Sequence, residues 1–246
     1  MATTTGITPC ASDYYLSKEG AAHYKRKYAR LGKRISHRKE CSILRRLLRK
    51  AGKARTILDI PCGTGRFFPV ISAFAQEVHM ADMSPQMLEV GREVSGNKAA
   101  AYQIKNVFDL DALSADGIVS ARLMQHLHDE ALQLKYFEAL AQAASKWIIV
   151  TFRDSQAPHT IFRRLMRRIK GKDDLAAMST RRVRGIMKGH GFNLIESLAV
   201  SGFFSGHKFA LFVRAGQCCP PPPIAHGFCL LNTPAQAILM ISQSGV

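Results

Sequence analysis

Short apolar runs alternate with amphipathic stretches over most of the 246-residue chain. The amphipathic stretches have the spacing of helices, whereas the apolar runs are rich in the aliphatic and aromatic residues that favour strands. This alternation is typical of an α/β fold in which helices cover both faces of a mostly parallel sheet. We predict seven strands, at residues 56–60, 77–83, 99–105, 116–123, 145–152, 193–200 and 207–214.

Two helices are predicted before the first strand, at residues 12–31 and 38–50. The second has apolar residues on one face and basic residues on the other, and Gly52 follows it as a typical C-terminal stop. Residues 1–55 are therefore expected to form a basic helical cover, and residues 56–216 the α/β core. The last 30 residues, 217–246, contain a run of four prolines and no charged residue, so we expect a disordered tail without a catalytic role. The alternative is a tail that docks its apolar patch, Ala237 to Ile241, on a partner.

The first strand leads directly into a glycine-rich turn, in the segment TILDIPCGTGRFF. Asp59 lies within this strand, and Gly63 and Gly65 form the turn. Glycine tolerates positive φ and lets a ligand approach the backbone, so the amides of the turn and of the following helix can face a ligand. Asp59 adds an acceptor for a cationic or hydroxyl group. The segment predicts a site for a nucleotide-like ligand.

The second strand, in the segment EVHMADM, ends in Asp82, 23 residues after Asp59. An acidic residue at this position is suited to hold a ribose diol. Ser84 and Pro85 follow and are expected to begin a helix. The pair LDIPCGTGRF and ADMSPQML resembles the class I S-adenosylmethionine-dependent methyltransferases, in their small-molecule branch of the type 11 and type 25 group.

This resemblance implies a Rossmann-like sheet whose last strand pairs antiparallel, and S-adenosylmethionine as the cofactor. Nicotinamide-binding folds usually have a third glycine at the start of the helix, where this chain has Arg66, Phe67 and Phe68. That difference favours the methyltransferase interpretation.

The resemblance also assigns residues to the cofactor site. Met83 matches a position that packs on the adenine ring, although an apolar residue in a turn equally suits ordinary packing. Asn106 occupies a position where the family commonly has an Asp, and its side chain still offers an acceptor. The residues assigned to the cofactor are Asp59, Gly63, Gly65, Asp82, Met83, Asn106, Val107 and Ala121.

The acceptor side of the site is assigned to residues near the fourth strand and in the N-terminal cover. Arg122 is expected to contact a carboxylate of the cofactor or of the substrate, and Tyr24 or Tyr28 to close over the bound ligands. His126 stands where many family members have a histidine near the transferred methyl group. A histidine of near-neutral pKa can accept the substrate proton, but His126 would also fit as a packing residue in a first helical turn.

The net charge of +17 is concentrated on both sides of the core. Residues 18–55 contain fifteen Lys and Arg against two acids, and residues 161–190 contain ten against two. The second segment includes an amphipathic helix, predicted at residues 160–172, with an apolar stripe and an entirely basic opposite face. The stripe alone would suit packing on the domain, whereas the basic face suits a membrane interface or a phosphate-rich partner.

The sequence therefore predicts methyl transfer from S-adenosylmethionine to an O, N or C nucleophile of a small or lipid-like, anionic acceptor. The alternatives are an RNA methyltransferase that uses the basic segments, and a non-catalytic cofactor-binding partner subunit. The six cysteines have no metal-ligand spacing, so no metal is expected. Without a signal-peptide pattern or a long apolar run, we expect a cytoplasmic protein, peripheral at the membrane if the basic segments bind lipid.

Overall fold

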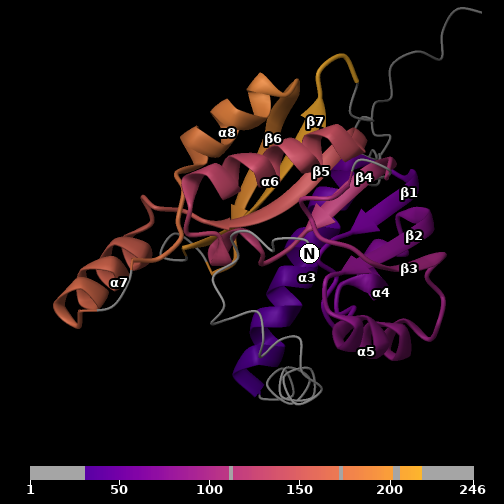
Figure 1. Cartoon of the computed structure of the whole chain (residues 1–246), viewed down its shortest axis with the longest axis horizontal. Coiled ribbons are helices and arrows are strands. Elements are labelled where there is room, and N and C mark those ends of the chain that lie inside the picture. Colours follow the sequence, from indigo (N-terminus) through magenta and orange to yellow (C-terminus); the bar gives the residue numbers. More distant parts are fainter. Residues whose placement is uncertain (1–30, 111–112, 172–173, 202–205, 218–246) are drawn as a thin grey trace, which may run out of the picture.

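Figure 1 shows the computed structural model, which describes residues 31–110, 113–171, 174–201 and 206–217. Its strands form one seven-stranded sheet in the order β3-β2-β1-β4-β5-β7-β6. Strand β7 pairs antiparallel with β5 and β6, and the other neighbouring pairs are parallel. The predicted α/β fold with an antiparallel last strand is confirmed. The strands are β1 Ala54–Asp59, β2 Ala75–Asp82, β3 Ala101–Ile104, β4 Ala115–Ser120, β5 Ala144–Arg153, β6 Phe192–Ala199 and β7 His207–Arg214.

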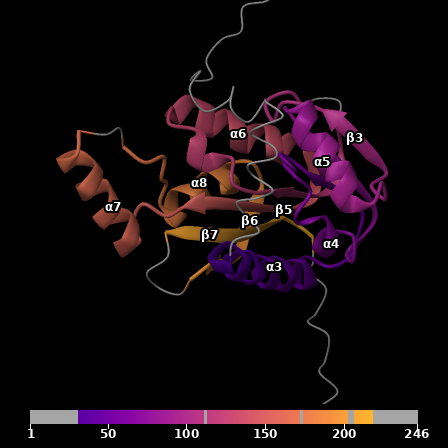
Figure 2. The same ribbon diagram turned by 90° about the horizontal axis from the view of Figure 1, so that it is seen from below.

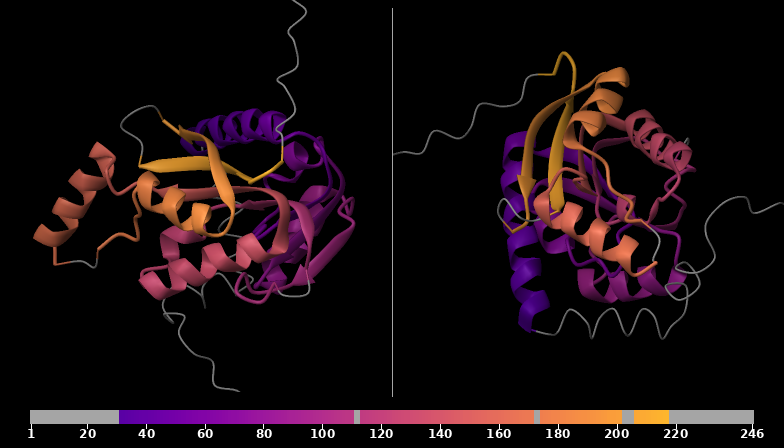
Figure 3. Two further views of the ribbon diagram at one scale, coloured as in Figure 1. Left: turned by 90° about the horizontal axis from the view of Figure 1, so that it is seen from above. Right: turned by 90° about the vertical axis from the view of Figure 1, so that its left-hand side faces the viewer.

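Helices cover both faces of the sheet, as Figures 2 and 3 show for α3 on one face and α6 on the other. The predicted helix at 38–50 begins earlier than expected, at Leu31. The predicted helix at 12–31, with Tyr24 and Tyr28, and the tail from residue 218 lie outside the described residues. The helices are α3 Leu31–Ala51, α4 Phe68–Ile71, α5 Pro85–Ser95, η1 Met124–His126, α6 Glu130–Ala143, α7 Pro158–Ile169 and α8 Thr180–Gly189.

The core has two layers because successive residues of a buried strand face opposite sides of the sheet. In β5, Ile149 faces the layer that contains Leu44 and Leu48 of α3, whereas Ile148 faces the layer beneath α6 and α8. All these side chains are almost completely buried. This two-sided burial explains the continuous apolar run of the β5 sequence.

The helix boundaries follow capping residues that the sequence predicts. Ser84 begins α5 by accepting a hydrogen bond from the amide of Met87, and Ser179 caps α8 in the same way. Gly52, with φ of 83°, follows α3 and donates its amide to the carbonyl of Leu48. These caps fix where each helix meets the sheet.

Helix α7 projects from the body of the molecule in Figure 1, whereas one interpretation of the sequence has its apolar stripe packed on the domain. Its apolar stripe does not pack on the domain, since Ile161, Phe162, Leu165 and Ile169 are each more than half exposed. Thr160 is its one buried residue. Among the described residues, no helix is both long and apolar enough to cross a membrane.

Candidate functional site

The predicted cofactor residues of the described chain follow four neighbouring strands at the same edge of the sheet. Asp59 ends β1, Asp82 ends β2, Asn106 follows β3, and Ala121 follows β4. The carboxyl ends of parallel strands share one edge, and open α/β sheets bind their ligands there. The topology therefore brings together residues that are distant in the sequence.

The carboxylate of Asp82 connects the glycine turn to the start of α5. Its Oδ2 accepts from the amide of Gly63 at 2.8 Å, and its Oδ1 accepts from the amide of Ser84 at 2.9 Å. Burial raises the pKa of Asp82, and these backbone hydrogen bonds oppose the rise. Each carboxylate oxygen has a second lone pair, so this fixed carboxylate can still accept from the hydroxyls of a ribose.

The two glycines of the turn are needed for different reasons. Gly65 has φ of 68°, and a Cβ there would lie 2.8 Å from Cε of Met80 and 3.1 Å from Cα of Gly91. It therefore lets the turn pack closely on α5. Gly63 has φ of 54°, but a Cβ there would meet no atom within 4 Å. Its outer side is open, so a ligand can approach the backbone there.

Asp59 is a buried carboxyl group without a hydrogen-bond partner. Asp59 is 1% exposed, and neither of its carboxylate oxygens has a hydrogen-bond partner. Burial raises its pKa to about 8, with opposition from the positive charge of Arg66 and a further increase from Asp82. A buried acceptor of this kind fits a ligand with a positively charged group, which would offset the cost of ionising it. The α-ammonium group of S-adenosylmethionine meets that requirement.

The residues assigned to adenine lie at the β3 side of the same edge. Met83 is 36% exposed, which leaves its side chain available for a ring. Oδ1 of Asn106 accepts from the amide of Phe108 at 3.2 Å, which orients the side chain. Val107 and Ala121 are buried in the core. The side chains of Val107 and Ala121 are therefore core residues, and their assigned contacts to the cofactor stay predictions.

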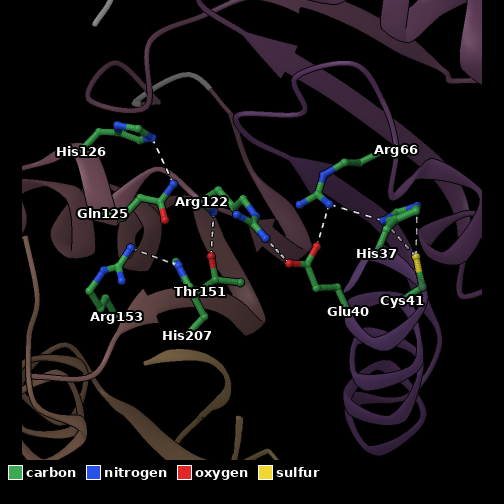
Figure 4. Close-up of polar contacts among 10 residues, drawn as sticks. All are labelled: His37, Glu40, Cys41, Arg66, Arg122, Gln125, His126, Thr151, Arg153 and His207. Carbon is green, nitrogen blue, oxygen red and sulfur yellow. Dashed lines mark hydrogen bonds and ion pairs between the residues drawn. The ribbon is translucent and has the colours of Figure 1, made fainter. Parts of the chain in front are cut away.

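A buried ion-pair network, which the sequence analysis did not anticipate, joins α3 to the edge of the sheet (Figure 4). Glu40 of α3 is 2% exposed and accepts from Nη1 of Arg66 at 2.6 Å and from Nη2 of Arg122. Burial alone would raise the pKa of Glu40, but the two guanidinium groups lower it. The Arg122 side chain, predicted to contact a ligand carboxylate, is thus bound to a carboxylate of the protein.

The backbone at Arg122 has an uncommon conformation. Its φ is 66°, a region that non-glycine residues rarely adopt, and its amide donates to Oγ1 of Thr151 at 2.6 Å. Such conformations are concentrated at functional sites. The two interactions hold Arg122 at the point where β4 leaves the sheet.

His126 lies in η1, directly after this segment, and its side chain is exposed. Partial desolvation and then the positive charges of His128, Arg122 and Arg153 lower its pKa below the ordinary value of 6.5. The imidazole is consequently neutral near pH 7 and can accept a proton. Nε2 of His126 lies 3.1 Å from Nε2 of Gln125, so one ring nitrogen is already in a hydrogen bond (Figure 4).

Known proteins share the fold of this chain. Residues 57–145 match the model of a family described as methyltransferase domain. Similar solved structures include magnesium protoporphyrin IX methyltransferase from Synechocystis PCC 6803 with bound S-adenosylhomocysteine, at 18% identity, covering 82% of this chain and 97% of that one, with a TM-score of 0.67. The search of curated proteins gave no match.

Two further structures resemble the chain at similar levels. The N-methyltransferase NodS from Bradyrhizobium japonicum WM9 has 14% identity and a TM-score of 0.58, over 73% of this chain and 97% of that one. An S-adenosylmethionine-dependent methyltransferase from Clostridium acetobutylicum has 13% identity and a TM-score of 0.61, over 79% and 99%.

The seven-stranded sheet and these similar structures show that the chain has the fold of the class I S-adenosylmethionine-dependent methyltransferases, and its residues 57–145 match the model of a methyltransferase domain. The domain match, and the S-adenosylhomocysteine and S-adenosylmethionine bound in the Synechocystis structures, support an S-adenosylmethionine-dependent methyltransferase. Within the described ranges, no group of three or more His, Cys, Asp or Glu residues could hold a metal ion.

Proposed function

We propose that S-adenosylmethionine binds along the carboxyl edge of the sheet, with its adenine near Met83 and Asn106, its ribose at Asp82 and its ammonium group at Asp59. The observation that carries this assignment is the Asp82 carboxylate, which the amides of Gly63 and Ser84 hold in place. The order of the strands, β3-β2-β1-β4, then runs from the adenine to the methionine end. The methyl group would lie near the end of β4.

The bound cofactor supplies an electrophilic methyl group, which a nucleophilic O, N or C atom of the acceptor takes. The protein contributes mainly by aligning the nucleophile with that group. His126 would accept the proton of a neutral nucleophile at Nε2, once the acceptor replaces Gln125, whose amide nitrogen donates to that ring nitrogen. Its lowered pKa keeps Nε2 unprotonated at neutral pH.

We propose a small or lipid-like, anionic acceptor. The excess of basic residues in the segments on both sides of the core supports an anionic molecule. The Synechocystis neighbour is a magnesium protoporphyrin IX methyltransferase, which supports a small acceptor.

We also propose that α7 docks on an anionic membrane surface. Its apolar stripe is exposed, and the remaining positions are mostly basic, so the helix can bury the stripe at the interface while its cations contact acidic headgroups. An RNA partner would use the same cations but would leave the apolar stripe without a role. The basic residues of this segment are Arg163, Arg164, Arg167, Arg168 and Lys170.

The acceptor can be identified by labelling. The full chain is incubated with S-adenosylmethionine carrying a tritiated methyl group and, separately, with a small-molecule extract, a lipid extract and total RNA. We expect label in the acidic small-molecule or lipid fraction. Label in the RNA alone would contradict the proposed acceptor, and label in none of the three would favour a non-catalytic subunit.

A further inference from the structure

Polar side chains replace the apolar core where β5 and β7 reach the functional edge of the sheet. Trp147 and Ile149 of β5 belong to the core layer beneath α3. Strand alternation places Thr151 and Arg153 on the same face, beyond them. His207 of β7 is directly opposite Arg153 in the antiparallel register. Figure 4 shows Thr151, Arg153 and His207 on the same side of the sheet as Arg122 and Glu40.

Arg153 is buried without a counter-ion. The residue is 7% exposed, and its Nη1 has no hydrogen-bond partner. Its Nη2 lies 3.2 Å from Nε2 of His207. Burial and the positive charges of Arg163, Arg122 and Arg167 lower the pKa of Arg153. No carboxylate of the described residues is within ion-pair distance of it.

The histidine does not supply the missing negative charge, and neither does Glu40. Burial, followed by the charges of Arg153 and Arg122, lowers the pKa of His207 to about 3, so this imidazole is neutral and accepts the hydrogen bond from Arg153. Glu40 is already bound to Arg66 and Arg122. Glu40 therefore pairs with two guanidinium groups and leaves Arg153 without a counter-ion, and burial of an uncompensated charge is costly.

The position of Arg153 separates it from the cofactor residues. Asp59 and Asp82 lie at β1 and β2, whereas Arg153 ends β5, with β4 between β5 and β1. Neighbouring strands are about 4.8 Å apart, so the ends of β1 and β5 are separated by roughly 10 Å. Arg153 therefore lies beyond the expected methyl group, on the side where the acceptor must approach.

We propose that Arg153, with Arg122 at its outer side, binds an oxyanion group of the methyl acceptor, a carboxylate or a phosphate. This inference rests on the proposed methyl transfer and names the group by which the acceptor is held. Arg122 keeps 28% of its side chain exposed and so forms the solvent side of the site. Guanidinium groups suit this role because they bind planar or tetrahedral oxyanions through several N–H donors.

The test uses the full chain and its Arg153→Met variant, with Arg55→Met as the matched control. Arg55 is exposed and is the second residue of β1, at the opposite edge of the sheet. Binding of inorganic phosphate and of benzoate is measured by calorimetry at constant ionic strength, with and without saturating S-adenosylhomocysteine. The preferred probe distinguishes a phosphate from a carboxylate on the acceptor.

We expect one probe to bind the wild type, and the Arg55→Met variant equally, also in the presence of S-adenosylhomocysteine. Arg153→Met should weaken that binding by about tenfold or more, since it removes a charge-assisted hydrogen bond. Without any anion, Arg153→Met should have the same thermal midpoint as the wild type or a higher one, because an unpaired buried cation is lost. A lower midpoint would instead indicate a structural role.

Four outcomes would overturn the inference: neither probe binds, Arg153→Met binds as tightly as wild type, Arg153→Met has a lower thermal midpoint, or S-adenosylhomocysteine displaces the probe. Displacement would mean that the oxyanion belongs to the cofactor. If S-adenosylhomocysteine itself fails to bind the wild type while a probe binds at Arg153, the proposed cofactor site fails and the anion site remains.

Discussion

Replacing Asp59 by Asn should stabilise the protein without cofactor, because Asp59 is buried without a partner. The folded state holds the Asp59 proton up to a pH of about 8, whereas an ordinary Asp loses it near 3.8. Between these values the unfolded chain binds fewer protons than the folded one. The stability that this residue contributes is therefore complete below pH 4 and decreases as the pH rises toward 8.

The expected gain in free energy of unfolding follows from the difference between the two pKa values of Asp59. At pH 7, keeping the carboxyl group protonated costs up to about 4 kcal/mol relative to the ionised unfolded chain. Asn has nearly the same shape and remains neutral, so it does not carry this cost. The variant should thus exceed the wild type in free energy of unfolding at pH 7 by up to that amount, and by little at pH 4.

Urea unfolding at pH 4, 5.5 and 7 measures this difference in free energy of unfolding. Asp116→Asn is the control, and it should destabilise the protein rather than stabilise it. Slight burial opposes ionisation of Asp116, but hydrogen bonds from Lys146 and from the Arg55 amide lower its pKa. Asp116→Asn should therefore be less stable than wild type at all three pH values and by a similar amount, because the stability that ionised Asp116 contributes is lost only as the pH falls below its ordinary pKa of 3.8. If Asp59→Asn differs from wild type by the same amount at each pH, the assignment of a protonated buried carboxyl group is wrong.

Three further predictions concern the ligands. Binding of S-adenosylhomocysteine at pH 7 should release a proton, because the ammonium group of this ligand favours the ionised form of Asp59. Calorimetry in buffers of different ionisation enthalpy should detect the released proton, and no release would contradict the pairing of the ammonium group with Asp59. His126→Asn should lower the single-turnover rate by about a hundredfold with an unchanged cofactor Kd, and an unaltered rate would assign His126 to packing. Replacing Phe162 and Ile169 of α7 by Gln should weaken binding to phosphatidylglycerol vesicles, measured by sedimentation, by at least about tenfold. Ile195→Gln, at another exposed site, should not weaken it. An equal loss of vesicle binding in both variants would exclude a specific role for α7.

The order of elements was predictable because each strand and cap has a local signature. The glycine turn, the Asp82 position and the serine caps depend on neighbouring residues, so the sequence alone indicates them. The one-turn helix α4 and the early start of α3 were less predictable, because tertiary packing decides how far such helices extend.

The ion-pair network of Glu40 and the buried Arg153 were not predicted, because their contacts join residues far apart in the chain. A signal for Glu40 exists in the sequence. It lies four residues before Leu44 and seven before Leu47, on the buried stripe of α3, where an acidic residue requires a partner. Arg153 follows the apolar run of β5, and nothing in the sequence indicates that it is buried. Its burial becomes evident only from the strand register that pairs it with His207.

The most direct test of the proposed site is calorimetric titration of the full chain and its Asp82→Ala variant with S-adenosylmethionine and S-adenosylhomocysteine. We expect saturable, micromolar binding of both ligands to the wild type and no measurable binding to the variant, with the fold of each verified by circular dichroism. Binding of equal affinity to a folded Asp82→Ala variant would place the ribose elsewhere. A folded wild type that binds neither ligand would contradict the proposed function.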